Sequence, residues 1–335
     1  MPCSNRSHLT FSRCADDARI SHPIYSHDLS KNYRGTQVWG PLNYSLCTDS
    51  NGFKTACDAT ENSLKSFDIA FIGDSFTEGI GLEYEDTFIG QISMKLPRLK
   101  IANLGVSSYS PSIYYAKVKF LLEQGITFKQ LVVYIDISDI QDEAVSRILV
   151  KDVVVPKSTV GAEIAGKFLR IKQLANWSFP LTYFGLHKLL STSNDAAEQK
   201  NYLMADYARS AWTYNRSSSG YGAGGVDGGI EQSLRAMSNL SDLLKERGIL
   251  LSVGVYPWPA QLLYDTSDSL QVRIWREFCE TRCIKFYDSF SSFFALKEKI
   301  LTEEIIEKYF IAGDVHHNRL GAQIIANDFL RSFKN

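Results

Sequence analysis

A short apolar run followed by a turn between glycines constrains the fold of this chain more than any other feature. Residues Phe67–Ile72, which read FDIAFI, have the length and composition of a buried β-strand. Residues Gly73–Gly79, which read GDSFTEG, follow directly, and apolar residues from Ile80 to Ile92 indicate a turn that leads into a helix. Ligands bind at the carboxyl ends of strands in open α/β sheets. The sequence therefore predicts that Ser75 faces a ligand-binding crevice.

A second motif favours a catalytic role for this serine over the alternative, an ordinary glycine-rich turn with a capping serine. Residues Gly313–Gly321 read GDVHHNRLG and precede a helix-like run. A nucleophilic serine needs a base that takes its proton and a carboxylate that orients the base. Asp314 and His316 offer both from one loop, which holds two of the six histidines of the chain. We expect Ser75, His316 and Asp314 to form a catalytic triad.

These motifs resemble those of the SGNH (or GDSL) hydrolase family, and the resemblance covers most of residues 67–333. In that family the serine of the first motif is the nucleophile, which is Ser75 in this sequence. The second motif contains a glycine whose N–H helps to form the oxyanion hole, and the matching stretch Asn103–Ser107 (NLGVS) places Gly105 there. The resemblance implies a flavodoxin-like, three-layer α/β fold. It also implies ester hydrolysis without a cofactor or a metal ion.

The third motif of the family is altered in this chain. The family places an asparagine after a strand, where its amide donates a hydrogen bond to the oxyanion. Here the strand is followed by residues Asp136–Asp139, which read DISD. Ser138 is the expected substitute donor beside the N–H groups of Ser75 and Gly105. The two aspartates would oppose an oxyanion if they pointed at it while ionised, so we expect them to brace the loop.

Two neighbouring histidines compete for the role of the base. The usual family spacing, Asp-x-x-His, selects His317. The downstream pattern His-x-Asn-x-x-Gly selects His316, and the shorter Asp-x-His spacing occurs in the branch that includes alginate-type O-acetyltransferases. We favour His316 as the base.

Strands and helices alternate from residue 67 onward, which predicts a parallel, doubly wound sheet. Residues 1–66 show no helical period, and we expect an irregular extension that packs on a main domain of residues 67–335. The pattern loosens at about 145–229, which indicates an insertion that shapes a substrate cleft. The expected strands are 68–72, 99–103, 130–136, 249–255 and 284–287, and the expected helices lie near 84–96, 111–124, 232–246 and 272–283.

Charge and hydropathy bear on two classes of partner, nucleic acids and membranes. The net charge is −1 and no run is rich in lysine or arginine, so a surface that tracks nucleic-acid phosphates is not expected. No apolar run has the length of a membrane-spanning helix, and the first 30 residues lack the apolar core of a signal peptide. The abrupt start at Met1 leaves open a signal or membrane tether removed from this sequence.

The six cysteines bear on the compartment. An even number of cysteines fits an oxidising environment, so we expect a periplasmic or extracellular protein, with a membrane anchor as a possible addition. The alternative is a cytoplasmic protein in which all six cysteines are reduced. No Cys-x-x-Cys or cysteine–histidine cluster indicates a zinc site. Cys47 and Cys57 flank a turn and are the expected disulfide, and the other pairs would be Cys279–Cys283 and Cys3–Cys14.

Aromatic side chains follow two of the strand ends. Tyr109 comes after the second motif, and Tyr256 and Trp258 come after the strand at 249–255. We expect these three to contact an acyl group or a sugar ring, with aromatic packing at a proline turn as the alternative. The expected activity is a serine esterase that removes O-acetyl groups from a carbohydrate or cell-envelope glycan. An O-acyltransferase with the same triad and a non-catalytic glycan-binding module stay open.

Overall fold

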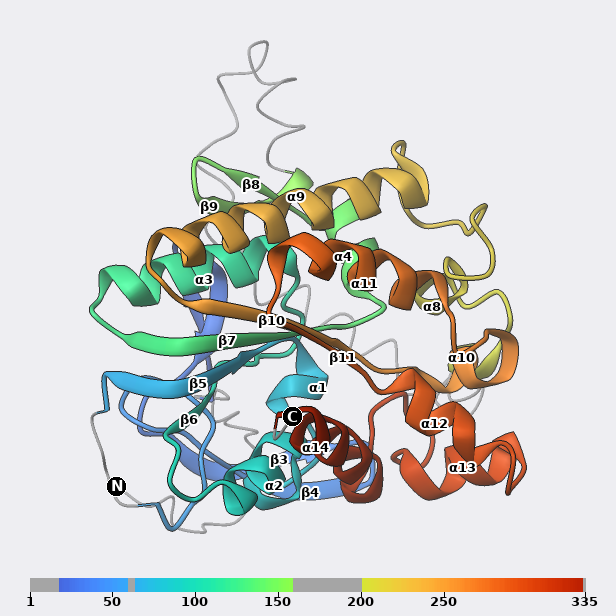
Figure 1. The fold of residues 1–335 in the computed structure, drawn as a ribbon, viewed down its shortest axis with the longest axis horizontal. Helices are drawn as coiled ribbons and strands as arrows, with labels where there is room; N and C mark the ends of the chain where they lie inside the picture. The colour runs from blue at the N-terminus through green and yellow to red at the C-terminus, as the bar shows by residue number, and fades with distance from the viewer. Residues whose placement is uncertain (1–17, 60–63, 159–200, 334–335) are drawn as a thin grey trace, which may run out of the picture.

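The computed structural model describes residues 18–59, 64–158 and 201–333, and its centre is a five-stranded parallel sheet (Figure 1). Numbered by their order along the chain, these strands follow the spatial order 2-1-3-4-5, which is that of flavodoxin-like sheets. The expected doubly wound α/β fold is confirmed. From one edge to the other, the strands are β6 (Ile101–Asn103), β5 (Ser66–Ile72), β7 (Thr127–Ile135), β10 (Leu250–Val255) and β11 (Lys285–Asp288).

Helices cover both faces of this sheet, which makes three layers (Figure 1). One face carries α3 (Pro111–Glu123), α4 (Asp139–Val145), α9 (Gly225–Glu246) and α11 (Leu270–Arg282). The other face carries α2 (Phe88–Lys95), α12 (Phe290–Leu296), α13 (Thr302–Tyr309) and α14 (Arg319–Phe333). Short helices and turns lie near the carboxyl ends of the strands: α1 (Ser75–Glu78), η1 (Tyr84–Asp86), η4 (Asn201–Leu203), α8 (Ala208–Ala211) and α10 (Pro259–Tyr264).

The helix α9 begins seven residues before its expected start, because its first turns are rich in glycine. Glycine lowers helix propensity, so the sequence pattern hides this part of the helix. The packing explains one of these glycines. A Cβ atom at Gly229 would lie 2.4 Å from the carbonyl oxygen of Ile140 in α4. Only glycine lets α9 approach α4 this closely.

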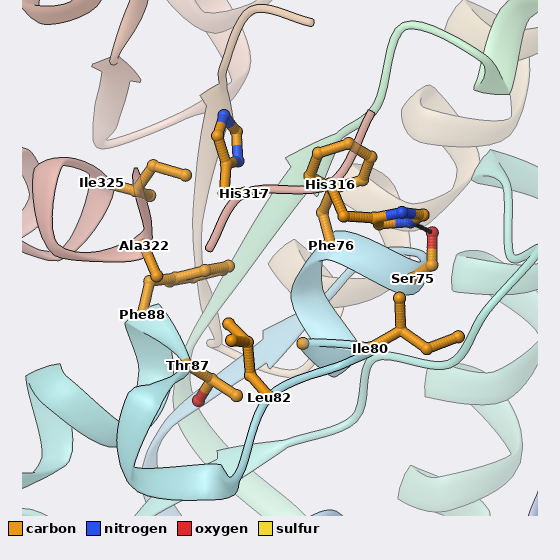
Figure 2. Close-up of a pocket in the computed structure, with 11 residues that line it drawn as sticks. Ser75, Phe76, Ile80, Leu82, Thr87, Phe88, His316, His317, Ala322 and Ile325 are labelled. Atoms are coloured by element: carbon orange, nitrogen blue, oxygen red, sulfur yellow. Dashed lines mark hydrogen bonds between the residues drawn. The ribbon is translucent and has the colours of Figure 1, made fainter. Parts of the chain in front are cut away.

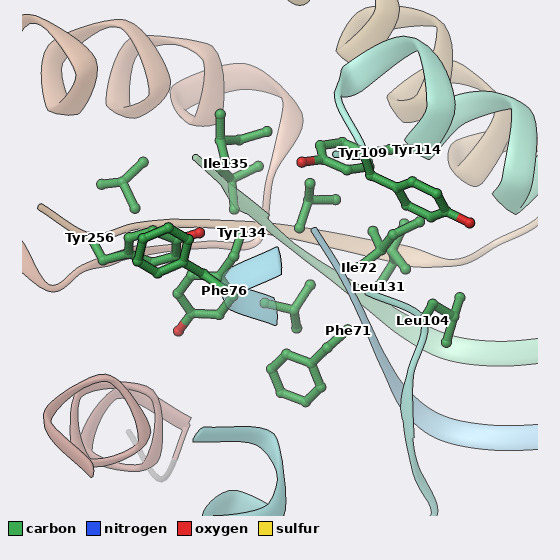
Figure 3. Packing of buried hydrophobic residues seen from close by; sticks show 14 of the residues in the cluster. Phe71, Ile72, Phe76, Leu104, Tyr109, Tyr114, Leu131, Tyr134, Ile135 and Tyr256 are labelled. Carbon is green, nitrogen blue, oxygen red and sulfur yellow. The ribbon is translucent and has the colours of Figure 1, made fainter. Parts of the chain in front are cut away.

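Aromatic side chains fill the core beneath the carboxyl edge of the sheet (Figure 3). Phe71 and Tyr134 lie on neighbouring strands, and both are fully buried. The ring of Tyr256 stacks on Phe76 at 4.8 Å between centroids and lies 6.0 Å from Tyr134. This continuous packing supports the turn that carries Ser75 from below.

In the part of the chain that the structure describes, three antiparallel hairpins lie outside the central sheet. The N-terminal extension forms β1 (Arg19–His22) with β2 (Ser26–Leu29), and β3 (Arg34–Trp39) with β4 (Leu42–Cys47). The insertion forms β8 (Arg147–Val150) with β9 (Val153–Pro156). The extension is anchored in the core by an ion pair of 2.7 Å between the buried side chains of Lys117 and Asp28.

The described residues contain two disulfides. Cys47 and Cys57 are bonded, with Cα atoms 5.2 Å apart, which confirms the expected pair. Cys279 and Cys283 are bonded as well. Cys3 and Cys14 lie outside the described residues, as do residues 159–200 of the insertion. Within the described ranges, no helix has both the length and the apolar character needed to span a bilayer.

Candidate active site

The chain turns sharply from β5 into α1, and this turn presents Ser75. The side chain of Asp74 caps α1 by accepting a hydrogen bond of 3.0 Å from the backbone N–H of Phe76. A Cβ atom at Gly73 would lie 2.7 Å from the carbonyl oxygen of Tyr134, so the strand end cannot hold a larger residue there. The turn lies between β5 and β7, where the strand order reverses, and ligands bind at such points.

Ser75, His316 and Asp314 lie in one hydrogen-bonded line. The Nε2 atom of His316 is 2.8 Å from the Oγ atom of Ser75 (Figure 2). The Nδ1 atom of His316 is 2.6 Å from the Oδ1 atom of Asp314, which also accepts from the backbone N–H of His316 at 3.0 Å. With Nδ1 protonated and bonded to the carboxylate, Nε2 is an acceptor for the serine proton.

Asp314 has a further donor from a distant part of the chain. The indole Nε1–H of Trp39 donates to the Oδ2 atom of Asp314 at 2.6 Å. Burial alone would raise the pKa of Asp314. The hydrogen bonds and charge of His316 together with the Trp39 hydrogen bond outweigh burial, and the pKa of Asp314 lies below its usual value. The carboxylate is therefore ionised where the base needs it.

His317 lies away from Ser75 and among aromatic rings (Figure 2). It is buried, it forms a hydrogen bond with the backbone of Pro257, and its Nε2 atom has no partner among the described residues. Burial, followed by the charge of His316, lowers the pKa of His317 to about 3. A neutral imidazole enclosed in this way has no access to the serine hydroxyl.

The three expected oxyanion donors differ in whether they already donate a hydrogen bond within the protein. The backbone N–H of Ser75 donates to no acceptor among the described residues. The N–H of Gly105 donates to the Oδ1 atom of Asn103 at 3.0 Å, and the hydroxyl of Ser138 donates to the Oδ1 atom of Asp136 at 2.6 Å. Only the Ser75 N–H is available without a rearrangement.

Three buried carboxyl groups gather beside Ser75. Asp74, Asp136 and Asp139 each have an oxygen within 4.8 Å of the others. Burial and then neighbouring carboxylates hold the pKa values of Asp74 and Asp139 well above the usual range, and burial raises the pKa of Asp136. Such a group could hold a cation. However, side chains of the protein already donate to it: Tyr256 to Asp74, Trp258 and Ser138 to Asp136, and Tyr114 to Asp139.

The aromatic residues expected at the substrate lie inside the protein. Tyr109 is fully buried, and its hydroxyl donates to the carbonyl of His27 at 2.7 Å. Tyr256 is fully buried and stacks on Phe76 (Figure 3), and Trp258 is 4% exposed. Tyr256 donates to Asp74 and Trp258 stacks on Phe76, so these two rings support the turn instead of lining an open cleft. Tyr109 packs against the N-terminal extension.

Sequence reasoning missed Trp39 and two tyrosines of the insertion. Burial and then the charge of Asp314 raise the pKa of Tyr202. Burial raises the pKa of Tyr207 against the opposing charge of Arg209, and the charges of Asp136 and Asp314 add to the rise. Tyr207 also lies 6.2 Å from Trp258, ring to ring. All three missed residues are only partly buried. No motif marks them, because their contacts arise from folding across long sequence separations.

A small cavity touches both Ser75 and His316. Its volume is about 10 Å³, roughly the space of one water-sized group. The remaining walls are mainly apolar and come from α1, α2, α14 and the loop after α1 (Figure 2). They include Ile80, Leu82, Phe88, Ala322 and Ile325.

No family model matches this chain, and no curated protein sequence matches it. Solved structures do match it. A lipolytic protein of the G-D-S-L family from Veillonella parvula is 12% identical, with a TM-score of 0.41 over 80% of this chain and 98% of the other. The acetylxylan esterase Axe2 from Geobacillus stearothermophilus is 13% identical, with a TM-score of 0.42 over 81% and 95%. The esterase EstA from Pseudoalteromonas sp. is 10% identical, with a TM-score of 0.41 over 81% and 97%. The chain is thus similar to esterases and lipolytic proteins of the G-D-S-L family.

Proposed function

We propose that this chain is a serine esterase of the SGNH type that removes small acyl groups, O-acetyl above all, from a carbohydrate. The observation that carries the proposal is the line of Ser75, His316 and Asp314, with gaps of 2.8 and 2.6 Å between partners. Nucleophile–base contacts of this length suit proton transfer. A module that only bound glycans would have no need of this alignment.

The reaction would proceed through an acyl-enzyme. The Oγ atom of Ser75 attacks the ester carbonyl while its proton moves to Nε2 of His316. His316 then gives this proton to the departing sugar oxygen, and Asp314 stabilises the imidazolium that forms between the two transfers. Water attacks the acyl-enzyme in the second half, its proton passing through His316 back to Ser75.

The oxyanion of this proposal faces the backbone N–H of Ser75. Gly105 and Ser138 would add donors only if their hydrogen bonds to Asn103 and Asp136 opened. One oxyanion donor is worth roughly 3–4 kcal/mol of transition-state stabilisation. The number of donors that act therefore decides how fast the acylation step is.

The size of the cavity supports acetyl as the acyl group. A volume of about 10 Å³ next to Ser75 and His316 is the space of one water-sized group, so the walls beside the serine favour the smallest acyl groups over longer chains. The partly buried rings of Tyr202 and Tyr207, on which the charge of Asp314 acts, offer faces for a sugar ring on that side of the site.

Two measurements test the proposal. A fluorophosphonate probe should label the wild-type protein and not Ser75→Ala. Wild-type protein should hydrolyse acetylated oligosaccharides and p-nitrophenyl acetate, whereas Ser75→Ala should retain no turnover that depends on the triad. Adding a glycan acceptor with the acetyl donor separates hydrolysis from transfer, because transfer in excess of hydrolysis would make the protein an O-acyltransferase. If the wild-type protein showed neither labelling nor turnover, the proposal that it is an esterase would be refuted.

A further inference from the structure

The N-terminal extension contacts two members of the candidate triad through one side chain. Trp39 is the last residue of β3, and its indole N–H donates to the Oδ2 atom of Asp314 at 2.6 Å. Its ring also meets the ring of His316 edge to face, with centroids 5.3 Å apart and an angle of 89° between planes. Trp39 therefore contacts both the acid and the base from a segment that holds none of the motifs.

Trp39 engages the carboxylate oxygen that His316 does not use. The Oδ1 atom of Asp314 accepts from two nitrogens of His316, the ring Nδ1 and the backbone N–H. The Oδ2 atom accepts from Trp39. A carboxylate held at both oxygens keeps its plane fixed, and such outer contacts set the orientation of a functional side chain. The direction of Nε2 towards Ser75 depends on that plane.

The tip of the β3–β4 hairpin is packed firmly enough to hold this position. A Cβ atom at Gly81 would lie 3.4 Å from the Cδ1 atom of Trp39 and 3.0 Å from the Cδ1 atom of Ile311. The tip therefore sits against the loop after α1 and the segment before Asp314. Val38, the preceding residue in the strand, points the other way and is 69% exposed.

The extension also holds the helix that carries the nucleophile. Both terminal nitrogens of the Arg19 guanidinium donate to the buried carboxylate of Glu78, at 2.6 and 3.0 Å. The buried Nζ atom of Lys54 donates to the carbonyl oxygens of Gly79 and Leu82, at 2.8 and 2.7 Å. Glu78 and Gly79 are the last residue and the cap of α1. The same extension thus fixes both the nucleophile and the acid.

We propose that Trp39 is a positioning residue of this active site, which keeps the carboxylate of Asp314 and the ring of His316 aligned with Ser75. The inference rests on the proposed function and adds to the active site a residue that lies outside the sequence motifs. The β3–β4 hairpin is then a component of the catalytic apparatus and not only a covering of the main domain.

Steady-state kinetics of Trp39→Phe are the first test, because phenylalanine keeps an aromatic ring beside His316 and removes the N–H. We expect kcat to fall roughly tenfold while KM stays within about twofold, since the lost hydrogen bond acts on proton transfer and not on substrate binding. Val38→Ala is the matched control in the same strand and should match the wild type. If Trp39→Phe loses stability, 3-benzothienylalanine at position 39 removes only the N–H.

The pH profile separates positioning from a structural role. Asp314 contacts His316 on its own loop and accepts from Trp39 of β3, and its charge also acts on Tyr202 and Tyr207 of the insertion. The Trp39 hydrogen bond contributes to the lowered pKa of Asp314. Its loss makes the carboxylate more basic, so the acid–base pair holds a proton more strongly. The acid limb of kcat/KM should move to higher pH in Trp39→Phe and stay in place in Val38→Ala.

A third measurement does not need turnover. The proton between His316 Nδ1 and Asp314 gives a downfield resonance in the proton NMR spectrum, which Trp39→Phe should shift or broaden. If the wild type had no Ser75-dependent activity, the esterase proposal would fail while this resonance still decided the role of Trp39. Identical resonances and identical kinetics in Trp39→Phe and Val38→Ala would overturn the inference.

Discussion

The Oδ1 atom of Asp136 accepts two hydrogen bonds from Ser138, one from the hydroxyl at 2.6 Å and one from the backbone N–H at 2.8 Å. Ser138 stands where the resembled family has its oxyanion-binding asparagine. A hydroxyl has a single proton to donate. In this structure that proton is committed to a buried carboxyl group and not to the crevice.

Ser138→Ala tests whether this commitment persists during catalysis. If it does, kcat for p-nitrophenyl acetate should stay within about threefold of the wild type, because Ser75 supplies the donor. The free energy of unfolding should fall by about 1–3 kcal/mol, since buried Asp136 loses a donor. Urea denaturation and steady-state kinetics measure the two effects. A fall in kcat of roughly 10²–10³-fold would instead make Ser138 an oxyanion donor.

The two adjacent histidines should respond oppositely to substitution. His316→Ala should abolish triad-dependent turnover, whereas His317→Phe should keep most of it, because His317 already lies among the rings of Phe76, Phe293 and Phe310. Activity of the two purified variants towards p-nitrophenyl acetate checks this. Loss of activity in a folded His317→Phe variant alone would reassign the base.

His317 should also weaken the fold in acid. Its pKa is lowered to about 3 in the folded protein from an ordinary value of 6.5, so the unfolded chain binds the extra proton between these values. Stability is therefore complete above about pH 6.5 and declines as the pH falls, by about 2 kcal/mol at pH 5. Urea denaturation from pH 7 to 5 should show this slope in the wild type and a flatter one in His317→Phe. Equal slopes would contradict a buried neutral imidazole.

The Asp139→Asn variant should become more stable than the wild type as the pH rises. Burial and the neighbours Asp74 and Asp136 hold the pKa of Asp139 well above 3.8, so its contribution to stability is present in acid and is lost as the pH rises through the folded pKa. Asparagine keeps an acceptor for the Tyr114 hydroxyl and carries no charge. Melting temperatures from pH 4 to 8 should diverge in favour of the variant. Asp206→Asn, at an exposed position, is the control. An Asp139→Asn protein less stable than the wild type at pH 8 would contradict the raised pKa of Asp139.

Local patterns predicted much of the fold and of the site. A buried parallel strand is a continuous apolar run, so β5, β7 and β10 are visible as runs, and the alternation with helices gives the sheet its layers. Ser75 lies in one short motif, and Asp314 and His316 lie in a second. The second motif is visible in the sequence because a base and the carboxylate that orients it can come from one loop. The structure brings these motifs together because both loops lie at the carboxyl edge of the sheet.

The remaining contacts could not be predicted, because they depend on packing between distant segments. Trp39 and Asp314 are 275 residues apart, and the alternation in β3 does not indicate what its last residue meets. Tyr256 and Trp258 follow a strand end, as substrate-binding residues do. A position after a strand does not determine whether a side chain points into the crevice or back into the core, and both rings pack inward.

The Cys47–Cys57 disulfide should stabilise the hairpin that carries Trp39. It joins the end of β4 to a residue ten positions later, and closing a loop of this size is worth about 2–4 kcal/mol. Replacing both cysteines with serine should lower the melting temperature and also lower kcat, because the base of the hairpin is released. Replacing Cys279 and Cys283, which lie in α11 and directly after it, should lower stability without changing the pH profile of kcat/KM. If the two double variants had equal effects on kcat, the hairpin would have no specific role in catalysis.

Ile80 should limit the length of the acyl group. It lines the small cavity that Ser75 and His316 share, so Ile80→Ala enlarges the space next to the nucleophile (Figure 2). We expect the wild type to prefer p-nitrophenyl acetate to the butyrate, and the ratio of the two kcat/KM values to fall about tenfold in the variant, since each methylene in an apolar pocket is worth about 1–3 kcal/mol. Ile305→Ala in α13 creates a comparable buried cavity away from Ser75 and should cost similar stability, about 2–5 kcal/mol, with no change in this ratio. An unchanged ratio in a folded Ile80→Ala protein would place the acyl group elsewhere, because a chain that does not enter this cavity cannot respond to its volume.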